Sequence, residues 1–198
     1  MISWKVRQSV CGLAELPAKS GAGVTHLLSI LDPGFSEVEH FELGPHARLT
    51  LYFDDILSPR PGLMTPDASH VAALLTFGRN LPDNDPVHLL VHCHAGISRS
   101  TAAMAALLAQ ANPEADERAV MSHLAHIRPQ AWPNLLMVSL ADKYLGRRGR
   151  LIEAVGSLYA RQIMATPGIA QEMTRYGRGA EVRLGRSSLP LEIGDAVP

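Results

Sequence analysis

The chain has 198 residues, of which 46% are hydrophobic, enough for one compact domain with a buried core. Its 18 basic and 19 acidic side chains leave a formal net charge of -1, so we expect neither nucleic acid nor a membrane as a partner. Two cysteines cannot build a disulfide framework. No apolar run is long enough to span a bilayer, and the first residues lack a signal-peptide pattern. Together these features predict a cytoplasmic protein.

Four apolar stretches predict β-strands, at residues 8–13, 24–31, 47–53 and 87–92. The second and fourth are nearly continuous apolar runs, which is typical of parallel strands covered on both faces.

Helical patterns separate and follow these strands. The first is expected from Pro66, with Thr65 as its N-cap, and the others over residues 99–111, 112–127, 134–145 and 150–164. Strands alternating with helices, followed by helices alone, favour a three-layer α/β fold. The expected centre is a mostly parallel sheet of four to five strands with helices on both faces.

The periodicity fades after residue 164. We therefore expect a folded domain over residues 1–164 and a basic, loosely ordered tail over residues 165–198. Residues 143–186 hold nine basic and three acidic side chains, so this part of the chain is either solvated surface or a contact for an acidic partner.

The stretch LLVHCHAGISRSTAAMAALLAQ, residues 89–110, carries the chemistry. A strand ends near Cys93, a loop containing Gly96 follows, and a helix begins near Arg99. Unpaired amides and the helix dipole favour an anion at such a turn and favour thiolate over thiol at the cysteine. Arg99 adds a planar two-pronged donor for phosphate oxygens, and Ser100 adds a hydroxyl. Nucleophile, anion cradle and charge clamp together indicate phosphoryl transfer.

Other interpretations of these residues stay open. Cys93 is a buried structural cysteine in one of them. In another, His88, His92 and His94 share one face of the strand and form a metal site beside Cys93. Cys11 is either a core residue or a partner thiol for Cys93.

The run from His92 to Ser100 resembles the H-C-x-x-G-x-x-R-[S/T] signature of cysteine-dependent protein tyrosine phosphatases, and AGISRS is closest to their dual-specificity branch. RPQAWPN, residues 128–134, is similar to the R-x(n)-P-N segment of that branch. The run from LYFDDI to ADKYLGRRGRLIEAV, residues 51–155, is similar to a compact bacterial subgroup of these enzymes, and the resemblance to the phosphatases covers about residues 8–155.

This resemblance implies a two-step mechanism with no metal and no other cofactor. Cys93 forms a phosphocysteine, Ser100 helps to expel the sulfur, and His92 orients the loop and favours the thiolate. The implied phosphate-binding residues are His94, Ala95, Gly96, Ile97, Ser98 and Arg99.

The resemblance also implies an aspartate that protonates the leaving oxygen. The W-P-D tripeptide of the larger tyrosine phosphatases is absent, so the acid is expected in FDDI. Strand periodicity sends Asp54 and Asp55 to opposite faces and does not choose between them. The subgroup resemblance favours Asp55, although its spacing of 38 residues to Cys93 is long for this branch. Asp67 suits the start of a helix better.

The expected activity is that of a protein-tyrosine phosphatase on phosphorylated proteins or small phosphomonoesters, with phosphoserine and phosphothreonine as further substrates. The alternatives are the same chemistry on a phosphoinositide or another small molecule, and a phosphate-binding module without turnover. The loop lacks the lysines typical of phosphoinositide enzymes, so that substrate ranks second. Because every candidate lies before residue 101, we expect the chain from residue 166 onward to be dispensable for hydrolysis of a small aryl phosphate.

Overall fold

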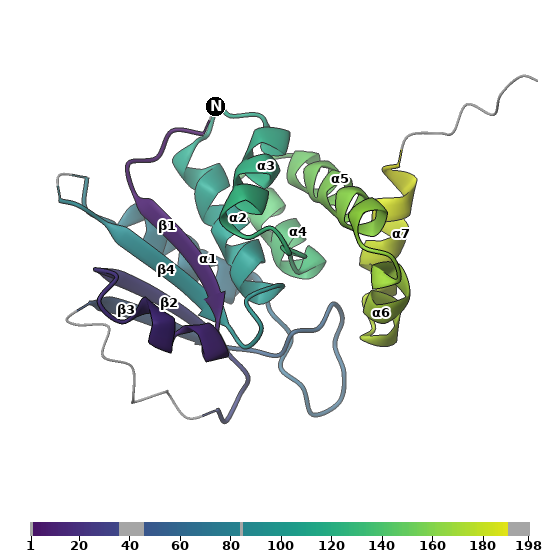
Figure 1. The fold of residues 1–198 in the computed structure, drawn as a ribbon, viewed down its shortest axis with the longest axis horizontal. Helices are drawn as coiled ribbons and strands as arrows, with labels where there is room; N and C mark the ends of the chain where they lie inside the picture. Colours follow the sequence, from purple (N-terminus) through teal and green to yellow (C-terminus); the bar gives the residue numbers. More distant parts are fainter. Residues whose placement is uncertain (1, 36–45, 84, 190–198) are drawn as a thin grey trace, which may run out of the picture.

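The computed structural model describes residues 2–35, 46–83 and 85–189, and its centre is a four-stranded sheet (Figure 1). The strand order is β1-β4-β2-β3, and each neighbouring pair is parallel. The strands are β1 (Arg7–Gly12), β2 (His26–Leu31), β3 (Ala47–Tyr52) and β4 (His88–Cys93). All four expected strands are confirmed, with ends that differ by no more than two residues.

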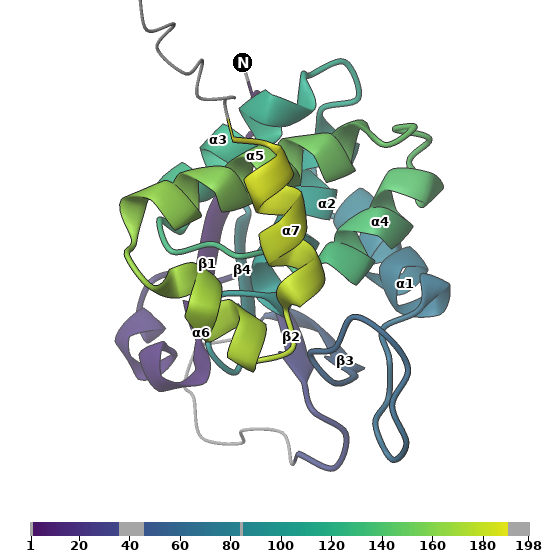
Figure 2. The ribbon, with the colours of Figure 1, turned by 90° about the vertical axis from the view of Figure 1, so that its right-hand side faces the viewer.

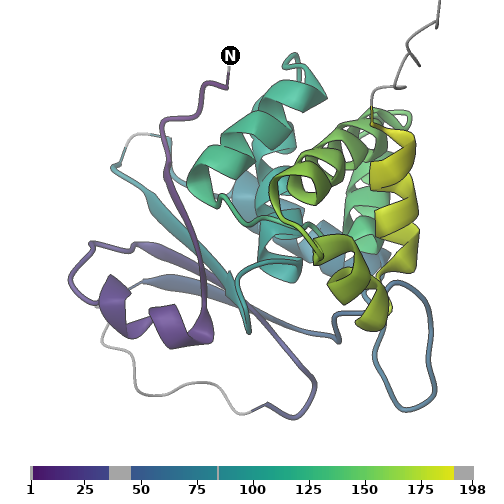
Figure 3. The ribbon, with the colours of Figure 1, turned by 45° about the vertical axis from the view of Figure 1, so that its right-hand side comes forward.

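The α-helices lie on one side of the sheet, and two short 3₁₀-helices lie on the other (Figures 1 and 3). The elements are α1 (Ala68–Arg79), α2 (Arg99–Ala111), α3 (Glu117–Ile127), α4 (Leu135–Tyr144), α5 (Arg150–Ala165), α6 (Ile169–Arg175) and α7 (Gly179–Ser187), with η1 (Leu13–Glu15) and η2 (Pro17–Lys19). The 3₁₀ layer covers a small apolar cluster that contains Cys11, Leu16 and Leu90. The predicted α/β fold is therefore confirmed.

Helix α2 is the central helix of the α-helical layer. It contacts three strands as well as α1, α3 and α4, and all but the last two of its 13 residues are buried. Five buried alanines, at positions 102, 103, 105, 106 and 109, make this close approach possible because they present little side-chain volume. The buried helix fixes the position of the loop that precedes Arg99.

Two helices begin later than predicted. The N-cap of α1 is Asp67 rather than Thr65, because the Asp67 carboxylate accepts the amides of Ser69 and His70. Likewise α3 is capped by Asp116, whose side chain accepts the amide of Arg118 at 2.7 Å. The expected start at Asn112 is wrong, since the Asn112 amide group closes the end of α2 and its oxygen accepts the amide of Ser3.

The expectation of a loosely ordered segment after residue 164 is wrong for α6 and α7. Helix α7 packs along α5 and against α6 (Figure 2). Gly185 permits the close contact, because a Cβ atom there would lie 2.8 Å from the Cβ of Tyr159. Val182 and Glu181 are buried in the same interface. Most residues of α7 are charged or small, so its short apolar face gives no clear helical periodicity in the sequence.

Within the described residues, no helix combines the length and apolarity that crossing a membrane requires.

Candidate active site

The loop between β4 and α2 makes a turn that requires glycine at position 96. Gly96 has φ of +70°, in the left-handed region, and a Cβ there would lie 2.4 Å from backbone atoms of Cys11 and Gly12. Both conformation and space therefore exclude a side chain, and the loop lies tightly over the end of β1.

The carbonyl oxygens of residues 94–98 all accept hydrogen bonds from outside the loop. In a trans peptide the next N–H points opposite to the carbonyl, and no peptide bond in the described residues is cis. The amides of residues 95–99 therefore point away from these outer donors, and that of Gly96 donates to Cys93 Sγ. In loop order the donors are Leu13 N, Arg128 Nη2, Arg128 Nε, Trp132 N and Asn134 N.

Arg128 supplies two of these donors and is itself held in place. Its two terminal nitrogens bond the carboxylate oxygens of Glu15 at 2.8 and 2.7 Å. Glu15 also accepts the amide of Gly12 at 2.6 Å. This bidentate pair fixes the outer side of the loop, and the hydrogen bond from the Arg128 side chain lowers the pKa of Glu15.

Cys93 ends β4, with only 2% of its surface exposed. The Gly96 amide donates to its Sγ atom at 3.2 Å, and the Ser100 hydroxyl lies 3.2 Å from the same sulfur. Ser100 is fully buried in the first turn of α2. The sulfur therefore meets an amide, a hydroxyl and the first turn of a helix, where donors surround it.

Arg99 is the buried cation of the loop. Its Nη1 atom bonds the carboxylate of Asp32 and the carbonyl of Phe53, both at 2.6 Å. Its Nε atom is buried without a hydrogen-bond partner in the described part of the chain. A buried unpaired donor on a guanidinium is costly unless an anion accepts from it. The orphaned nitrogen fits a bound phosphate oxygen.

His92 lies directly before Cys93 and is almost fully buried. Its Nε2 atom is 2.7 Å from the Ser29 hydroxyl on the neighbouring strand β2. Burial lowers the pKa of His92 to about 4, so the ring is neutral near pH 7. This geometry suits an orienting role, while the neutral ring adds no positive charge behind the sulfur.

The other histidines considered as metal ligands have separate partners. His88 lies between Ser9 and the Ala22 carbonyl, and His94 lies against Asp32. No cluster of His, Cys, Asp and Glu suited to holding a metal occurs among the described residues. The interpretation of these histidines as a metal site therefore has no support in their geometry.

Cys11 is a fully buried residue of the small cluster under the 3₁₀ layer. Burial raises the pKa of its thiol to about 12, which makes it a poor nucleophile at neutral pH. This environment agrees with the core interpretation.

The two aspartates of FDDI have different surroundings. Asp54 closes the following loop on itself, because its backbone amide and carboxylate bond the carbonyl and amide of Met64. Asp55 instead accepts hydrogen bonds at Oδ1 from Ser98 and Asn134, each at 2.8 Å. Asn134 is also the N-cap of α4.

A pocket of about 590 Å³ opens over this loop, and residues from four separate parts of the chain line it. The lining residues are Asp55, Cys93, His94, Ala95, Ile97, Ser98, Arg99, Trp132, Ile169, Glu172, Met173, Tyr176 and Arg178. Five of the thirteen come from α6 and the short link between α6 and α7. The chain after residue 166 therefore contributes to the pocket wall, although the prediction that it is dispensable for hydrolysis of a small aryl phosphate assumed a site made only by earlier residues.

Sequence reasoning missed three charged residues here: Asp32, Arg178 and Glu181. Asp32 had a readable signal, since it directly follows β2 at the same sheet edge as Cys93. Arg178 and Glu181 had none, because they lie in a charge-rich stretch without clear periodicity.

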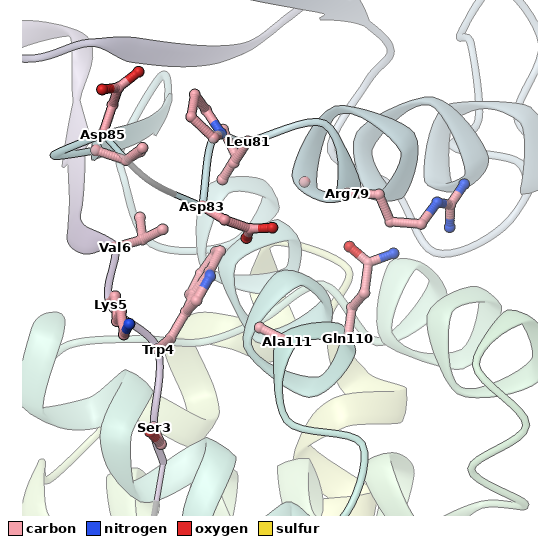
Figure 4. Close-up of a pocket in the computed structure, with 13 residues that line it drawn as sticks. Ser3, Trp4, Lys5, Val6, Arg79, Leu81, Asp83, Asp85, Gln110 and Ala111 are labelled. Carbon is pink, nitrogen blue, oxygen red and sulfur yellow. The ribbon is translucent and has the colours of Figure 1, made fainter.

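A second pocket, of about 560 Å³, lies at the opposite ends of the strands (Figure 4). Its walls include Val6 and Val87, which precede β1 and β4, and the ends of α1 and α2. Neither cysteine lines it.

No protein-family model matches the chain, and no curated protein is similar to it in sequence. Solved structures nevertheless share its fold. Human DUSP28 superposes with a TM-score of 0.53 at 16% identity, covering 71% of this chain and 92% of its own. The Yvh1 phosphatase domain from Chaetomium thermophilum gives 0.51 at 21% identity, with 76% and 96% covered. PTPMT1 in complex with PI(5)P gives 0.51 at 14% identity, with 71% and 91% covered.

These neighbours are phosphatases, and the match extends over most of each of their chains. At such identities the likeness establishes the fold of this chain.

Proposed function

We propose that this protein is a cysteine-dependent phosphatase that hydrolyses phosphomonoesters through a phosphocysteine intermediate. The observation that carries the proposal is the loop itself: a sulfur that faces an amide and a hydroxyl, beside a buried arginine whose Nε atom has no hydrogen-bond partner among the described residues. This arrangement holds a tetrahedral dianion in line with a nucleophile.

In the first step the Cys93 thiolate attacks phosphorus, and the bond from phosphorus to the leaving oxygen breaks. Asp55 gives its proton to that oxygen, so the leaving group departs as a neutral alcohol or phenol. The loop amides and Arg99 hold the three remaining phosphoryl oxygens.

In the second step a water molecule attacks phosphorus and gives a proton to the Asp55 carboxylate. The bond between phosphorus and sulfur breaks, and the Ser100 hydroxyl donates to the departing thiolate across the 3.2 Å contact. Inorganic phosphate leaves, and both Cys93 and Asp55 return to their starting states.

The pocket walls favour an aryl phosphate, and hence phosphotyrosine, as the substrate. Ile169 and Met173 of α6, with Tyr176 directly after it, present apolar and aromatic surface beside Trp132. A flat phenyl ring fits such walls, and its phosphate reaches the loop.

A phosphoinositide is the second candidate, because PTPMT1 has this fold and its structure holds PI(5)P. A headgroup with several phosphates needs several unpaired cations. Arg99 is already paired with Asp32, and Arg178 with Asp55 and Glu181. Glu172 adds a further negative charge to the wall. These charges favour the phosphotyrosine monoester.

The proposal is tested with wild-type protein in excess chelator, on a tyrosine-phosphorylated peptide, a serine-phosphorylated peptide and short-chain PI(5)P. We expect the highest kcat/KM on the phosphotyrosine peptide. Faster hydrolysis of PI(5)P would reverse the ranking of substrates. Phosphate binding with no turnover of any substrate would identify a binding module instead.

A further inference from the structure

The side chain of Arg178 connects three parts of the site that are distant in sequence. It lies directly before α7 and is only 5% exposed. Its Nη1 atom is 3.1 Å from Asp55 Oδ1, its Nη2 atom donates to the Ser98 hydroxyl, and its Nε atom is 3.1 Å from Glu181. One planar guanidinium thus connects Asp55 in the loop after β3, Ser98 in the loop between β4 and α2, and Glu181 in α7.

These contacts leave the two oxygens of Asp55 in different states. Oδ1 receives three donors, from Arg178, Ser98 and Asn134. Oδ2 has no hydrogen-bond partner within the described residues, and Asp55 lines the pocket that contains Cys93. A carboxylic acid carries its proton on one oxygen, and the oxygen that already accepts three hydrogen bonds cannot also donate.

We propose that Arg178 is a positioning residue for proton transfer: it fixes Asp55 Oδ1 against the phosphate loop, so that Oδ2 carries the proton to the leaving group. The inference rests on the proposed function, in which Asp55 is the general acid. Arg178 itself touches neither the reacting atoms nor the leaving group in this role.

Glu181 holds the arginine in this orientation. It is fully buried and accepts from the Trp132 indole at 2.6 Å and the Leu135 amide at 2.9 Å. Those two donors fix the carboxylate, and the carboxylate fixes Arg178 Nε. The last helix of the described chain is therefore part of the proton-transfer apparatus as well as a wall of the pocket.

The test compares phenyl phosphate, a poor leaving group, with p-nitrophenyl phosphate, a good one. Removing Arg178 alone leaves a buried glutamate without its cation, which destabilises the folded state strongly. The main variant is therefore Arg178→Met with Glu181→Gln, which leaves neither residue charged. Arg186→Met is the matched control, since Arg186 is an exposed arginine on the same helix. Thermal melting of each variant establishes that it is folded.

We expect the double variant to lose about 10- to 100-fold in kcat on phenyl phosphate, part of the 10²–10⁴-fold that a general acid contributes. It should lose little on p-nitrophenyl phosphate, because that leaving group needs no proton. Arg186→Met should match wild type on both. In an Asp55→Asn background the same double change should cost little more, because the residue through which Arg178 acts is already gone.

An equal loss on both substrates, or a full further loss in the Asp55→Asn background, would overturn the inference and leave Arg178 with a structural role. Failure of the proposed function has a different signature: wild type would hydrolyse neither ester, or Cys93→Ser would remain as active as wild type.

Discussion

Two pockets of almost the same size lie at opposite ends of one parallel sheet, with volumes of about 590 and 560 Å³. The first contains Cys93 and two buried arginines, Arg99 and Arg178. In the second, Lys5 and Asp83 are exposed to solvent. Volume therefore does not distinguish them. The first pocket differs because its arginines are buried, and because Arg99 Nε has no hydrogen-bond partner within the described residues.

The sheet accounts for this difference. In a parallel α/β sheet the helices that follow the strands start at the carboxyl ends, so their unpaired amides gather there. At the opposite ends of β1 and β4 the chain only enters the sheet, and the polar groups there remain solvated. If this comparison is correct, substitutions at the first pocket change catalysis and substitutions at the second do not.

The largest effect is expected from Cys93→Ser. The serine hydroxyl is a far weaker nucleophile than a thiolate, so turnover of p-nitrophenyl phosphate should fall to background while the loop still binds a phosphate analogue such as vanadate. Steady-state rates and calorimetric titration measure the two properties. Turnover near the wild-type rate would exclude the phosphocysteine mechanism.

Asp55→Asn should follow, with kcat on phenyl phosphate lowered by about 10²–10⁴-fold and a much smaller loss on p-nitrophenyl phosphate. Asp54→Asn is the matched control, because Asp54 bonds the backbone of its own loop. The reverse pattern would make Asp54 the acid. If neither substitution matters, the proton donor lies elsewhere.

Arg99→Lys should lower kcat by about 10²–10³-fold on both aryl phosphates, similar to the loss of one oxyanion donor in other enzymes. A lysine keeps the charge but cannot pair with Asp32 and phosphate through separate nitrogens. The insensitivity of this loss to the leaving group separates it from the effect of Asp55. Normal kinetics would remove Arg99 from the site.

Glu181→Gln should change the pH dependence of stability. Burial raises the pKa of Glu181 from 4.5 to about 7, so between these values the folded state holds a proton that the unfolded state has lost. Its contribution is complete below pH 4.5 and disappears as pH rises through 7. The wild type should therefore lose, relative to the variant, on the order of 3 kcal/mol between pH 4.5 and 7.5, at about 1.4 kcal/mol per pKa unit.

Urea unfolding of both proteins at several pH values measures this difference. Parallel stability curves would mean that Glu181 is already ionised at pH 5 and that Arg178 compensates fully for its burial.

The smallest effect, within about twofold of wild type, is expected at the second pocket, where exposed substitutions are nearly neutral. Lys5→Met combined with Asp83→Asn removes one charge of each sign from its rim and keeps the net charge. Activity on both aryl phosphates and the melting temperature should stay unchanged. A clear loss of activity would show that the two ends of the sheet are functionally coupled, and it would contradict the comparison.

Local patterns predicted most of this site. Cys93, Gly96 and Arg99 lie in one turn between an apolar strand and an alanine-rich helix, and such a turn is read from adjacent residues. The choice of Asp55 over Asp54 also required the resemblance to a known family, since strand periodicity alone did not distinguish the two residues.

Arg178 was beyond sequence reasoning for a physical reason. Nine basic residues lie between positions 143 and 186, and nothing local separates this one from its exposed neighbours. Its burial depends on Asp55 and Glu181, which approach it only after α7 packs on α5. The same packing decides that α6 lines the pocket instead of forming a loose tail.

The contact between Asp55 and Arg178 joins positions 123 residues apart. Chains emerge from the ribosome in order, and distant contacts close late because loop entropy must be overcome. The sheet and the phosphate loop are complete in sequence by Arg99, whereas α7 is synthesised about eighty residues later. A nascent chain therefore contains Cys93 and the loop after it well before Arg178 can hold Asp55. During refolding, burial of Cys93 should precede the return of activity toward esters with poor leaving groups.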